Sequence, residues 1–207
     1  HPDVRAFEVR GRDARPAGLF LSDNFARPSK RGGAWMSAYR WQSRAHGETL
    51  PVIVNNNNFA RAPAGESTLL SADDVRTVFH EFGHGLHGLL SQVTYERLSG
   101  TQVLRDFVEL PSQIFEHWAF EPEVLGRHAR HHATGEALPA EAIEKLARAR
   151  RFNQGFEAVE YTSCALVDMA LHANPDPAGV DIDAFEASEL RRIGMPREIV
   201  MRHRLPH

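Results

Sequence analysis

Two histidines and a glutamate near residue 80 have the spacing of a metal-binding helix. His80 and His84 stand at positions i and i+4, with Glu81 between them. On an α-helix these positions lie one above the other, so both imidazoles would point at a single ion, and neutral imidazole is a favoured zinc ligand. Glu81 lies about 100° further round the helix, where its carboxylate could take a proton from a water on the open side of the metal. The segment therefore predicts a site for one zinc ion, with Glu81 as the general base.

A catalytic zinc needs a third protein ligand and an open fourth position. A third histidine from the same segment is excluded, because Leu90 stands where that histidine would be. The alternative is a glutamate from a following helix. Glu109 is the best candidate, because the turn-like Ser99-Gly100-Thr101 separates it from the first helix. Glu116, on the same expected second helix, is the runner-up.

Three neighbouring polar residues are candidates for orienting the ligands from behind. His87 falls on nearly the same side of the helix as His80 but two turns along, and a packing histidine is an equal alternative for it. Asp106 and Gln113 flank Glu109 at i−3 and i+4, so either could hold that carboxylate in place.

The elements that must position these side chains are helices. Ser71, followed by Asp73 and Asp74, is typical of a helix N-terminus with acidic residues in its first turn. Apolar residues then recur at spacings of three and four, which indicates a buried stripe made of Val75, Val78, Phe79, Phe82, Leu86, Leu89 and Leu90. A second helix is expected over residues 106–120, and later helices over 140–154, 156–173, 183–193 and 196–203.

The first sixty residues are expected to form β structure. Strands are indicated over residues 4–10, 17–25, 34–44 and 50–54 by aromatic and β-branched residues between turn-rich segments. The last of these runs into four asparagines, 55–58. This polar run is interpreted either as a strand end or turn, or as a sheet edge that holds a peptide backbone by strand addition.

Composition excludes several classes of function. The chain has 207 residues, a formal net charge of −3, 42% hydrophobic residues and one cysteine. This charge balance argues against nucleic acid as the main partner, and no apolar run approaches the roughly 18 residues of a membrane span. No signal peptide is expected from the first residues. The single cysteine, Cys164, is expected to be a small core residue and fits a reducing, cytoplasmic location. The histidines 128, 131 and 132 are interpreted as a solvated helix end.

Residues 80–87, 98–101 and 106–118 resemble the thimet oligopeptidase family of zinc peptidases. The resemblance is most specific at His-Glu-Phe-Gly-His and at Asp-Phe-Val-Glu-x-Pro-Ser-Gln. It implies His80, His84 and Glu109 as ligands of one zinc ion, Glu81 as general base, and oligopeptides as substrates. Bacterial peptidyl-dipeptidases are the most similar members, which implies release of dipeptides from C-termini. An endo-acting oligopeptidase of the same family is the alternative, and the oligomeric state stays open.

The expected fold class is α+β. A small antiparallel β region over residues 1–60 would be followed by a mainly helical zincin-type (HExxH) catalytic core over 61–207. The resemblance implies one incomplete catalytic domain, truncated at both ends. In the family, a His and tyrosines on a Gly- and Tyr-rich loop stabilise the oxyanion, and that loop is expected beyond His207. None of Tyr39, Tyr95 and Tyr161 lies in such a loop. This segment alone is therefore expected to bind zinc and to hydrolyse peptides poorly, and a metal-binding fragment without activity is the rival interpretation.

Overall fold

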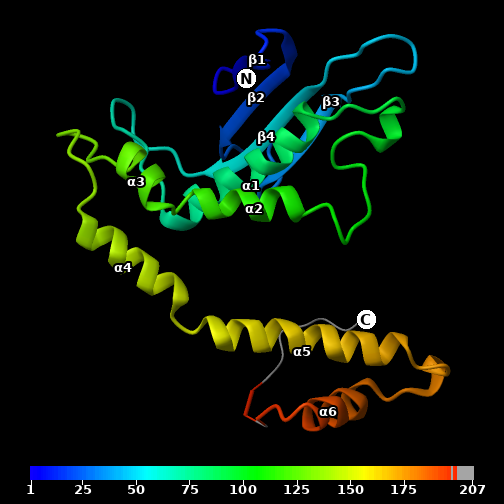
Figure 1. Ribbon diagram of the computed structural model, residues 1–207. Helices are drawn as coiled ribbons and strands as arrows, with labels where there is room; N and C mark the ends of the chain where they lie inside the picture. The colour runs from blue at the N-terminus through cyan, green and yellow to red at the C-terminus, as the bar shows by residue number, and fades with distance from the viewer. Residues whose placement is uncertain (197, 200–207) are drawn as a thin grey trace. The chain divides into compact units, whose positions relative to one another are not determined.

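The chain divides into two compact units, and the first carries the residues singled out above. The computed structural model describes residues 1–196 and 198–199. The first unit is His1–Ile143, and the second begins at Glu144. The first unit contains the strands β1 (Arg5–Arg10), β2 (Pro16–Phe25), β3 (Trp35–Arg40) and β4 (Val52–Phe59). They form one sheet in the order β1-β2-β4-β3, on which helix α1 packs, and helix α2 packs on α1 (Figure 1).

The sheet is mixed, and its parallel pair was not expected. β1 pairs with β2 and β3 pairs with β4 in antiparallel fashion, but β2 and β4 run parallel, with Leu19 opposite Val52 and Leu21 opposite Val54. The prediction of an antiparallel region is therefore wrong at the central pair. In the sequence, β3 comes between β2 and β4 and runs in the opposite direction to both, so β2 and β4 have the same direction. The α+β class is confirmed, with all four strands before the first helix.

The asparagine run lies inside the central strand. Asn55 and Asn57 belong to β4 and are 4% and 2% exposed. The run lies mainly in the C-terminal half of β4, so the interpretation as a strand end is confirmed in part, whereas a turn and a free sheet edge are both wrong. Polar composition suggested an exposed segment, but neighbouring strands cover β4 on both sides, and the outer strands of the sheet are β1 and β3. The run instead supplies amide groups to the interior of the first unit.

Helix α1 (Ala72–Leu89) begins where the sequence predicts. The Ser71 side chain accepts a hydrogen bond from the Asp74 backbone N–H, and the Asp74 carboxylate accepts one from the Ser71 N–H, so both ends of a capping box are present. The helix packs against β2, β3 and β4. Gly88 allows this contact, because a Cβ there would lie 2.7 Å from Cδ1 of Ile53 in β4.

The buried face of α1 is not the predicted apolar stripe. Its fully buried residues are Glu81, Gly83, His84, Gly85, Gly88 and Leu89. The other apolar residues of the stripe are half-buried, and Leu90, at the C-terminal cap, is 61% exposed. The helix lies between a sheet and a second helix, so glycines occupy the closest contacts and two ionisable residues are drawn inside.

Helix α2 (Leu110–Trp118) is shorter than predicted and packs on α1. Residues 105–109 form turns, so Glu109 is the N-cap residue and not part of a longer helix. Pro111 stands in the first turn, where its missing N–H is no cost. A 3₁₀ turn (Glu96–Leu98) lies between the two helices, and helix α3 (Pro122–His128) follows α2. Bounds for α3 were not predicted, but it ends at the exposed His128, which agrees with the solvated helix end expected there.

The second unit is helical. It contains most of α4 (Ala140–Arg151), then α5 (Gln154–His172), a 3₁₀ turn (Pro177–Gly179) and α6 (Ile182–Arg192). α5 and α6 pack on each other around Val167 and Leu171, against which Val180, Phe185 and Leu190 lie. Cys164 in α5 is half-buried. Of the predicted helix 196–203, residues 197 and 200–203 lie outside the described residues.

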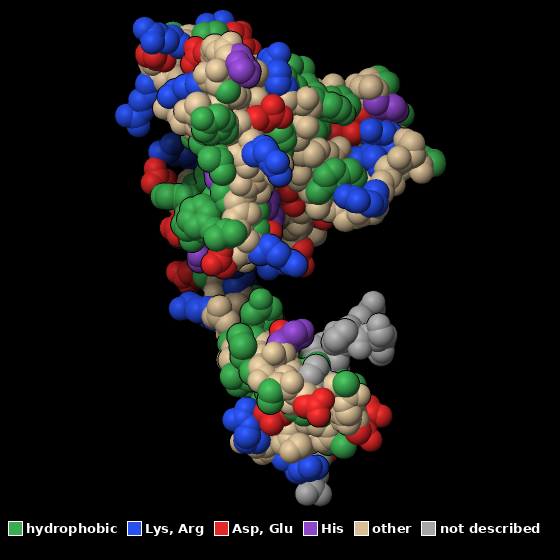
Figure 2. Space-filling model, turned by 90° about the vertical axis from the view of Figure 1, so that its right-hand side faces the viewer, with side chains coloured by type: hydrophobic (Ala, Val, Ile, Leu, Met, Phe, Trp, Pro, Cys, Tyr) green, Lys and Arg blue, Asp and Glu red, His purple; other side chains and the backbone are tan. Residues whose placement is uncertain are grey.

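The distribution of surface charge and the hydropathy of the helices bear on the class of protein. Acidic and basic side chains are interspersed over the face seen in Figure 2. Among the residues described, none of the helices is both long enough and apolar enough to pass through a lipid bilayer.

Candidate metal centre

The structure brings His80, His84 and Glu109 together. The Nε2 atom of His80 lies 3.2 Å from Oε2 of Glu109, and Nε2 of His84 lies 3.0 Å from the same oxygen. The two imidazole rings stand nearly perpendicular, with centroids 4.9 Å apart. One possible ligand atom from each residue lies within 4.8 Å of the other two. The i, i+4 spacing on α1 accounts for the histidine pair, and the N-cap residue of α2 supplies the carboxylate.

Gly83 explains how Glu109 reaches the histidines. A Cβ at Gly83 would lie 2.6 Å from the Cα of Ser112 and 2.7 Å from the carbonyl oxygen of Pro111. These distances are shorter than real Cβ contacts, so only a glycine lets the first turn of α2 approach α1 this closely. Glu109 is the residue just before that turn. The contact between the two helices therefore sets the position of its carboxylate.

Two further side chains contact the candidate ligands. Oε1 of Glu116 lies 2.6 Å from Nδ1 of His80, which leaves Nε2 of that ring for a metal. The Ser112 hydroxyl donates a hydrogen bond of 2.8 Å to Oε2 of Glu109. Sequence reasoning missed the Ser112 contact and considered Glu116 only as an alternative ligand. Both stand on the same side of α2 as Glu109, at i+3 and i+7, and that spacing is the signal that could have found them.

The three residues expected to orient the ligands lie elsewhere. Asp106 and Gln113 are exposed, and within the described residues neither side chain makes a hydrogen bond to the side chains of His80, His84 or Glu109. His87 is half-buried, with its ring centroid 6.1 Å from that of Phe107. Its Nδ1 is buried and has no hydrogen-bond partner among the described residues. Burial lowers the pKa of His87, which favours the neutral imidazole.

Glu81 lies beside the three residues but is not one of them. It is 5% exposed, and its Oε2 has no hydrogen-bond partner within the described part of the chain. Burial raises the pKa of this carboxyl above its usual value, and the charge on Glu109 acts in the same direction, whereas His80 opposes both. A carboxylate kept from water and left without a donor is a good proton acceptor.

The pKa shifts of His84 and Glu109 favour the protonation states that bind a metal. Burial, the largest influence, lowers the pKa of His84 below its usual value, so the imidazole is kept neutral. Burial alone would raise the pKa of Glu109. The hydrogen bond from Ser112 and the neighbouring His84 and His80 outweigh it, so the pKa of this carboxyl is lowered and it stays ionised. A neutral imidazole and an ionised carboxylate are the forms that coordinate a cation.

These residues line a cleft of about 290 Å³. One wall is formed by His80, Glu81 and His84 of α1, and by Glu109 with Val108. The rest of the lining consists of Thr101, of Ala34, and of Trp35 and Met36 at the start of β3. Because β3 is an outer strand of the sheet, one of its edges pairs with no other strand of the described residues.

The donor set fits a tetrahedral zinc ion. Ligand atoms at about 2.0–2.1 Å from such an ion lie roughly 3.3 Å from one another. The separations of 3.2 and 3.0 Å between the imidazole nitrogens and Oε2 of Glu109 are close to that value. The carboxylate of Glu116 on the far nitrogen of His80 is the usual support for a histidine ligand. Together with the buried Glu81, these groups define a candidate site for metal-assisted hydrolysis.

Comparison with known proteins gives the family. The model of peptidase family M3 matches residues 1–205 of the chain, and the chain therefore belongs to peptidase family M3. It is 49% identical over 191 residues to a dipeptidyl carboxypeptidase of Escherichia coli strain K12, a match that covers 92% of this chain and 28% of that protein. A dipeptidyl carboxypeptidase of Salmonella typhimurium is 49% identical over 172 residues, which cover 83% of this chain and 25% of the relative.

A differently named relative is also similar. Oligopeptidase A of Salmonella typhimurium is 41% identical over 180 residues, which cover 86% of this chain and 26% of that protein. The chain thus spans about a quarter of the length of the curated relatives it matches.

Proposed function

We propose that this chain carries the zinc site of a peptidase that hydrolyses oligopeptides. His80, His84 and Glu109 would hold one zinc ion, which supplies a Lewis acid and makes a bound water more acidic. The observation that carries this proposal is the convergence of two imidazole nitrogens on one carboxylate oxygen, at 3.2 and 3.0 Å, in a cleft beside the buried Glu81. Membership of peptidase family M3 supports peptides as the substrate class.

Glu81 is the proposed general base. Its carboxylate lines the cleft beside His80 and His84, and its Oε2 has no donor among the described residues. The carboxylate would take the proton of the attacking water and pass it to the leaving amine. Its raised pKa suits the second step, because a stronger base holds the proton until the amine departs. Glu116 and Ser112 keep the His80 ring and the Glu109 carboxylate in fixed orientations meanwhile.

The outer edge of β3 is the proposed binding surface for the peptide backbone. Ala34, Trp35 and Met36 line the cleft opposite α1, and β3 pairs with β4 on its other side only. An extended peptide that adds to this edge would pass beside the proposed metal ligands. Strand addition, which the sequence suggested for the asparagine run, is thus proposed at β3 instead.

Dipeptide release from C-termini is the proposed specificity. The names and the 49% identity of the two dipeptidyl carboxypeptidases support it, whereas the 41% identity to oligopeptidase A supports an endo-acting peptidase as the alternative. The test is digestion of an oligopeptide by the full-length protein. Stepwise loss of dipeptides that stops when the C-terminus is amidated is expected. Internal cleavage that ignores amidation would replace this specificity with the alternative.

The segment alone is proposed to bind about one zinc ion and to hydrolyse peptides poorly. Turnover needs a donor for the developing oxyanion, and none of Tyr39, Tyr95 and Tyr161 lines the cleft. Metal analysis tests the ligand set, because His84→Ala and Glu109→Ala should each lose zinc. Retention of zinc by either variant removes that residue from the set. The proposed setting is the cytoplasm, which the single cysteine supports.

A further inference from the structure

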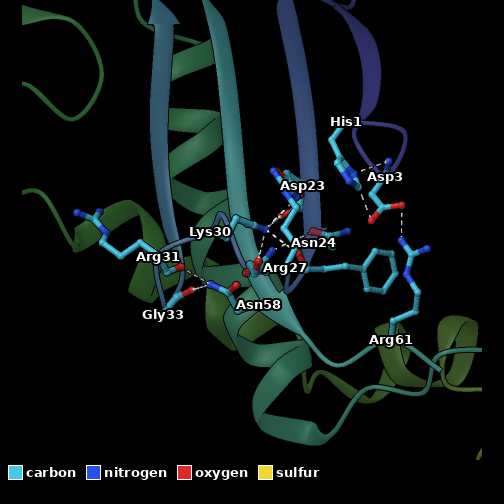
Figure 3. Close-up of polar contacts among 12 residues, drawn as sticks. His1, Asp3, Asp23, Asn24, Arg27, Lys30, Arg31, Gly33, Asn58 and Arg61 are labelled. Carbon is cyan, nitrogen blue, oxygen red and sulfur yellow. Dashed lines mark hydrogen bonds and ion pairs between the residues drawn. The ribbon is translucent and has the colours of Figure 1, made fainter. Parts of the chain in front are cut away.

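The connection between β2 and β3, residues 26–34, is tied to the sheet by a buried lysine. The Lys30 side chain is 4% exposed. Its ammonium donates to the Asp23 carboxylate at 3.1 Å, to the Phe25 carbonyl at 3.1 Å, and to the Asn57 carbonyl in β4 (Figure 3). An ammonium out of water is costly unless it is paired and hydrogen-bonded, and here its donors are used. Lys30 therefore has one defined position, against β4.

Asp23 is the counter-charge for this lysine and for a second cation. Its carboxylate is 4% exposed and accepts two hydrogen bonds from the Arg27 guanidinium, at 2.7 and 2.6 Å. Arg27 and Lys30 both belong to the connection, whereas Asp23 belongs to β2. The first half of the connection is thus clamped between two strands of the sheet.

Asn58 ties the second half of the connection. Its side-chain amide donates to the carbonyl oxygens of Arg31 and Gly33, each at 2.7 Å. The pairing of β3 with β4 begins only at Trp35, opposite Asn56, so the Asn58 side chain extends the contact beyond the ladder. The Arg31 guanidinium also lies 5.0 Å from the centroid of the Trp35 ring. One member of the asparagine run, Asn58, thus makes hydrogen bonds to the segment that leads into β3.

The last residue of this connection and the first two residues of β3 form a wall of the candidate site. Ala34, Trp35 and Met36 come directly after the atoms that Asn58 holds, and they line the cleft with His80, Glu81 and His84. Neither Lys30 nor Asn58 lines that cleft. We propose that Lys30 and Asn58 are positioning residues, which fix the start of β3 over the metal ligands and thereby set the affinity for peptide. This inference rests on the proposed function, since it assumes that peptide binds along β3.

The test separates peptide binding from metal binding. Asn58→Ala and Lys30→Met would be made in the full-length protein, each combined with Glu81→Gln so that a labelled hexapeptide is bound without turnover. The matched control for the first variant is Asn56→Ala, because Asn56 lies on the same strand face and its side chain makes no hydrogen bond to the connection among the described residues. Arg12→Met, on the exposed β1–β2 turn, is the control for the second.

Three measurements are made on each variant. Zinc content and the dissociation constant of the hexapeptide report on the ligands and on the cleft wall. The rate of trypsin cleavage after Arg31 reports on the connection itself and needs no peptidase activity. Asn58→Ala is expected to weaken peptide binding about tenfold, to keep its zinc, and to be cleaved faster after Arg31, and Lys30→Met should behave in the same way. Both controls should match the parent protein.

The outcomes distinguish this inference from the proposed function. Faster cleavage after Arg31 with unchanged peptide affinity would overturn the positioning role, as would an equal loss of affinity in Asn56→Ala. Loss of zinc in parallel with peptide affinity would show that the contacts support the whole fold and would also overturn it. If Lys30→Met fails to fold, the Asn58→Ala variant still tests the positioning role, because Asn58 is only half-buried. A protein that binds the hexapeptide in the Glu81→Gln form but shows no turnover with Glu81 present refutes the proposed function alone.

Discussion

Glu81 is buried beside the candidate ligands but contributes no atom to their cluster. Glu81→Gln keeps the shape of the side chain and removes its ability to accept a proton. In the full-length protein we expect zinc content to stay unchanged and turnover to fall by about 10²- to 10⁴-fold. Atomic absorption and a peptide digestion assay measure the two effects. A zinc-free Glu81→Gln protein would instead make Glu81 a ligand, and a variant with full turnover would remove it from the reaction.

Glu116 acts through His80, since its carboxylate lies 2.6 Å from Nδ1 of that ring. Glu116→Ala should weaken zinc binding about 10- to 100-fold, because the ring loses the group that fixes its orientation. Competition with a zinc chelator measures the change. Gln113→Ala is the matched control on the same helix and should bind zinc as the parent does. If Gln113→Ala binds zinc more weakly and Glu116→Ala binds it as the parent does, Gln113 is the orienting residue that the sequence suggested.

Because of Asp23, we expect the free energy of unfolding of the first unit to decrease at acidic pH. The hydrogen bonds from Arg27, followed by the contact with Lys30, lower the pKa of this carboxyl in the folded state. A lowered folded-state pKa means that the stabilisation is complete above the unfolded value of about 3.9 and is lost as the pH falls through the folded value. Asp23→Asn should be less stable than the parent at pH 6, by roughly 1–3 kcal/mol.

The difference between the two proteins should shrink as the pH falls below about 4, because the parent carboxylate becomes protonated while the amide does not change. Thermal melts between pH 6 and pH 3 follow this difference. A gap between parent and Asp23→Asn that stays constant over the whole range would show that Asp23 contributes no charge-dependent stability.

The contact of α1 with α2 depends on Gly83. Gly83→Ala would place a methyl group 2.6 Å from the Cα of Ser112, so α2 must move away, and Glu109 moves with it. Overpacking of this kind costs about 1–3 kcal/mol, and zinc affinity should fall by at least tenfold as the third ligand is displaced. Gly126→Ala in α3 is the control, because a Cβ there meets nothing within 4 Å and alanine favours a helix. Equal zinc affinity in the two variants would show that α2 adjusts without moving Glu109.

The elements that could be predicted from the sequence are those specified by local pattern. The N-terminus of α1 follows from Ser71 and Asp74, and the pairing of His80 with His84 follows from helix periodicity. The choice of Glu109 rested on a turn and a following helix, and the structure brings it to the histidines. Each of these inferences needs only a few consecutive residues or the length of one connection.

What could not be predicted depends on contacts between distant segments. The parallel pairing of β2 with β4 leaves no local signal, because each strand has the same alternation in either direction. The burial of the asparagine run follows from its central place in the sheet. The role of Glu116 depends on how α2 crosses α1, and Gly83 sets that crossing. The polar residues that support the site were therefore harder to identify than its ligands.

At the scale of the whole chain, the candidate site belongs to one unit. The proposed ligands, His80, His84 and Glu109, precede α4. Glu81, Ser112, Glu116 and the other residues that line the cleft precede it as well. The sheet, α1 and α2 supply the packing that brings them together. The second unit has its own small core around Val167 and Leu171. Zinc binding should therefore be a property of the first unit, whereas peptide turnover is proposed to need groups that the described residues do not bring to the cleft.

A chain of residues 1–139, ending before α4, should accordingly fold and bind zinc with an affinity within about threefold of the 207-residue chain. The physical reason is that no ligand, no hydrogen-bond partner of a ligand and no wall of the cleft is removed from the described structure. Zinc titration and circular dichroism of the two chains measure this. The same truncation combined with His84→Ala is the control for nonspecific binding by the other histidines, and it should bind no zinc at the site. A folded 1–139 chain that binds zinc tenfold or more weakly would show that the second unit contributes to the metal centre.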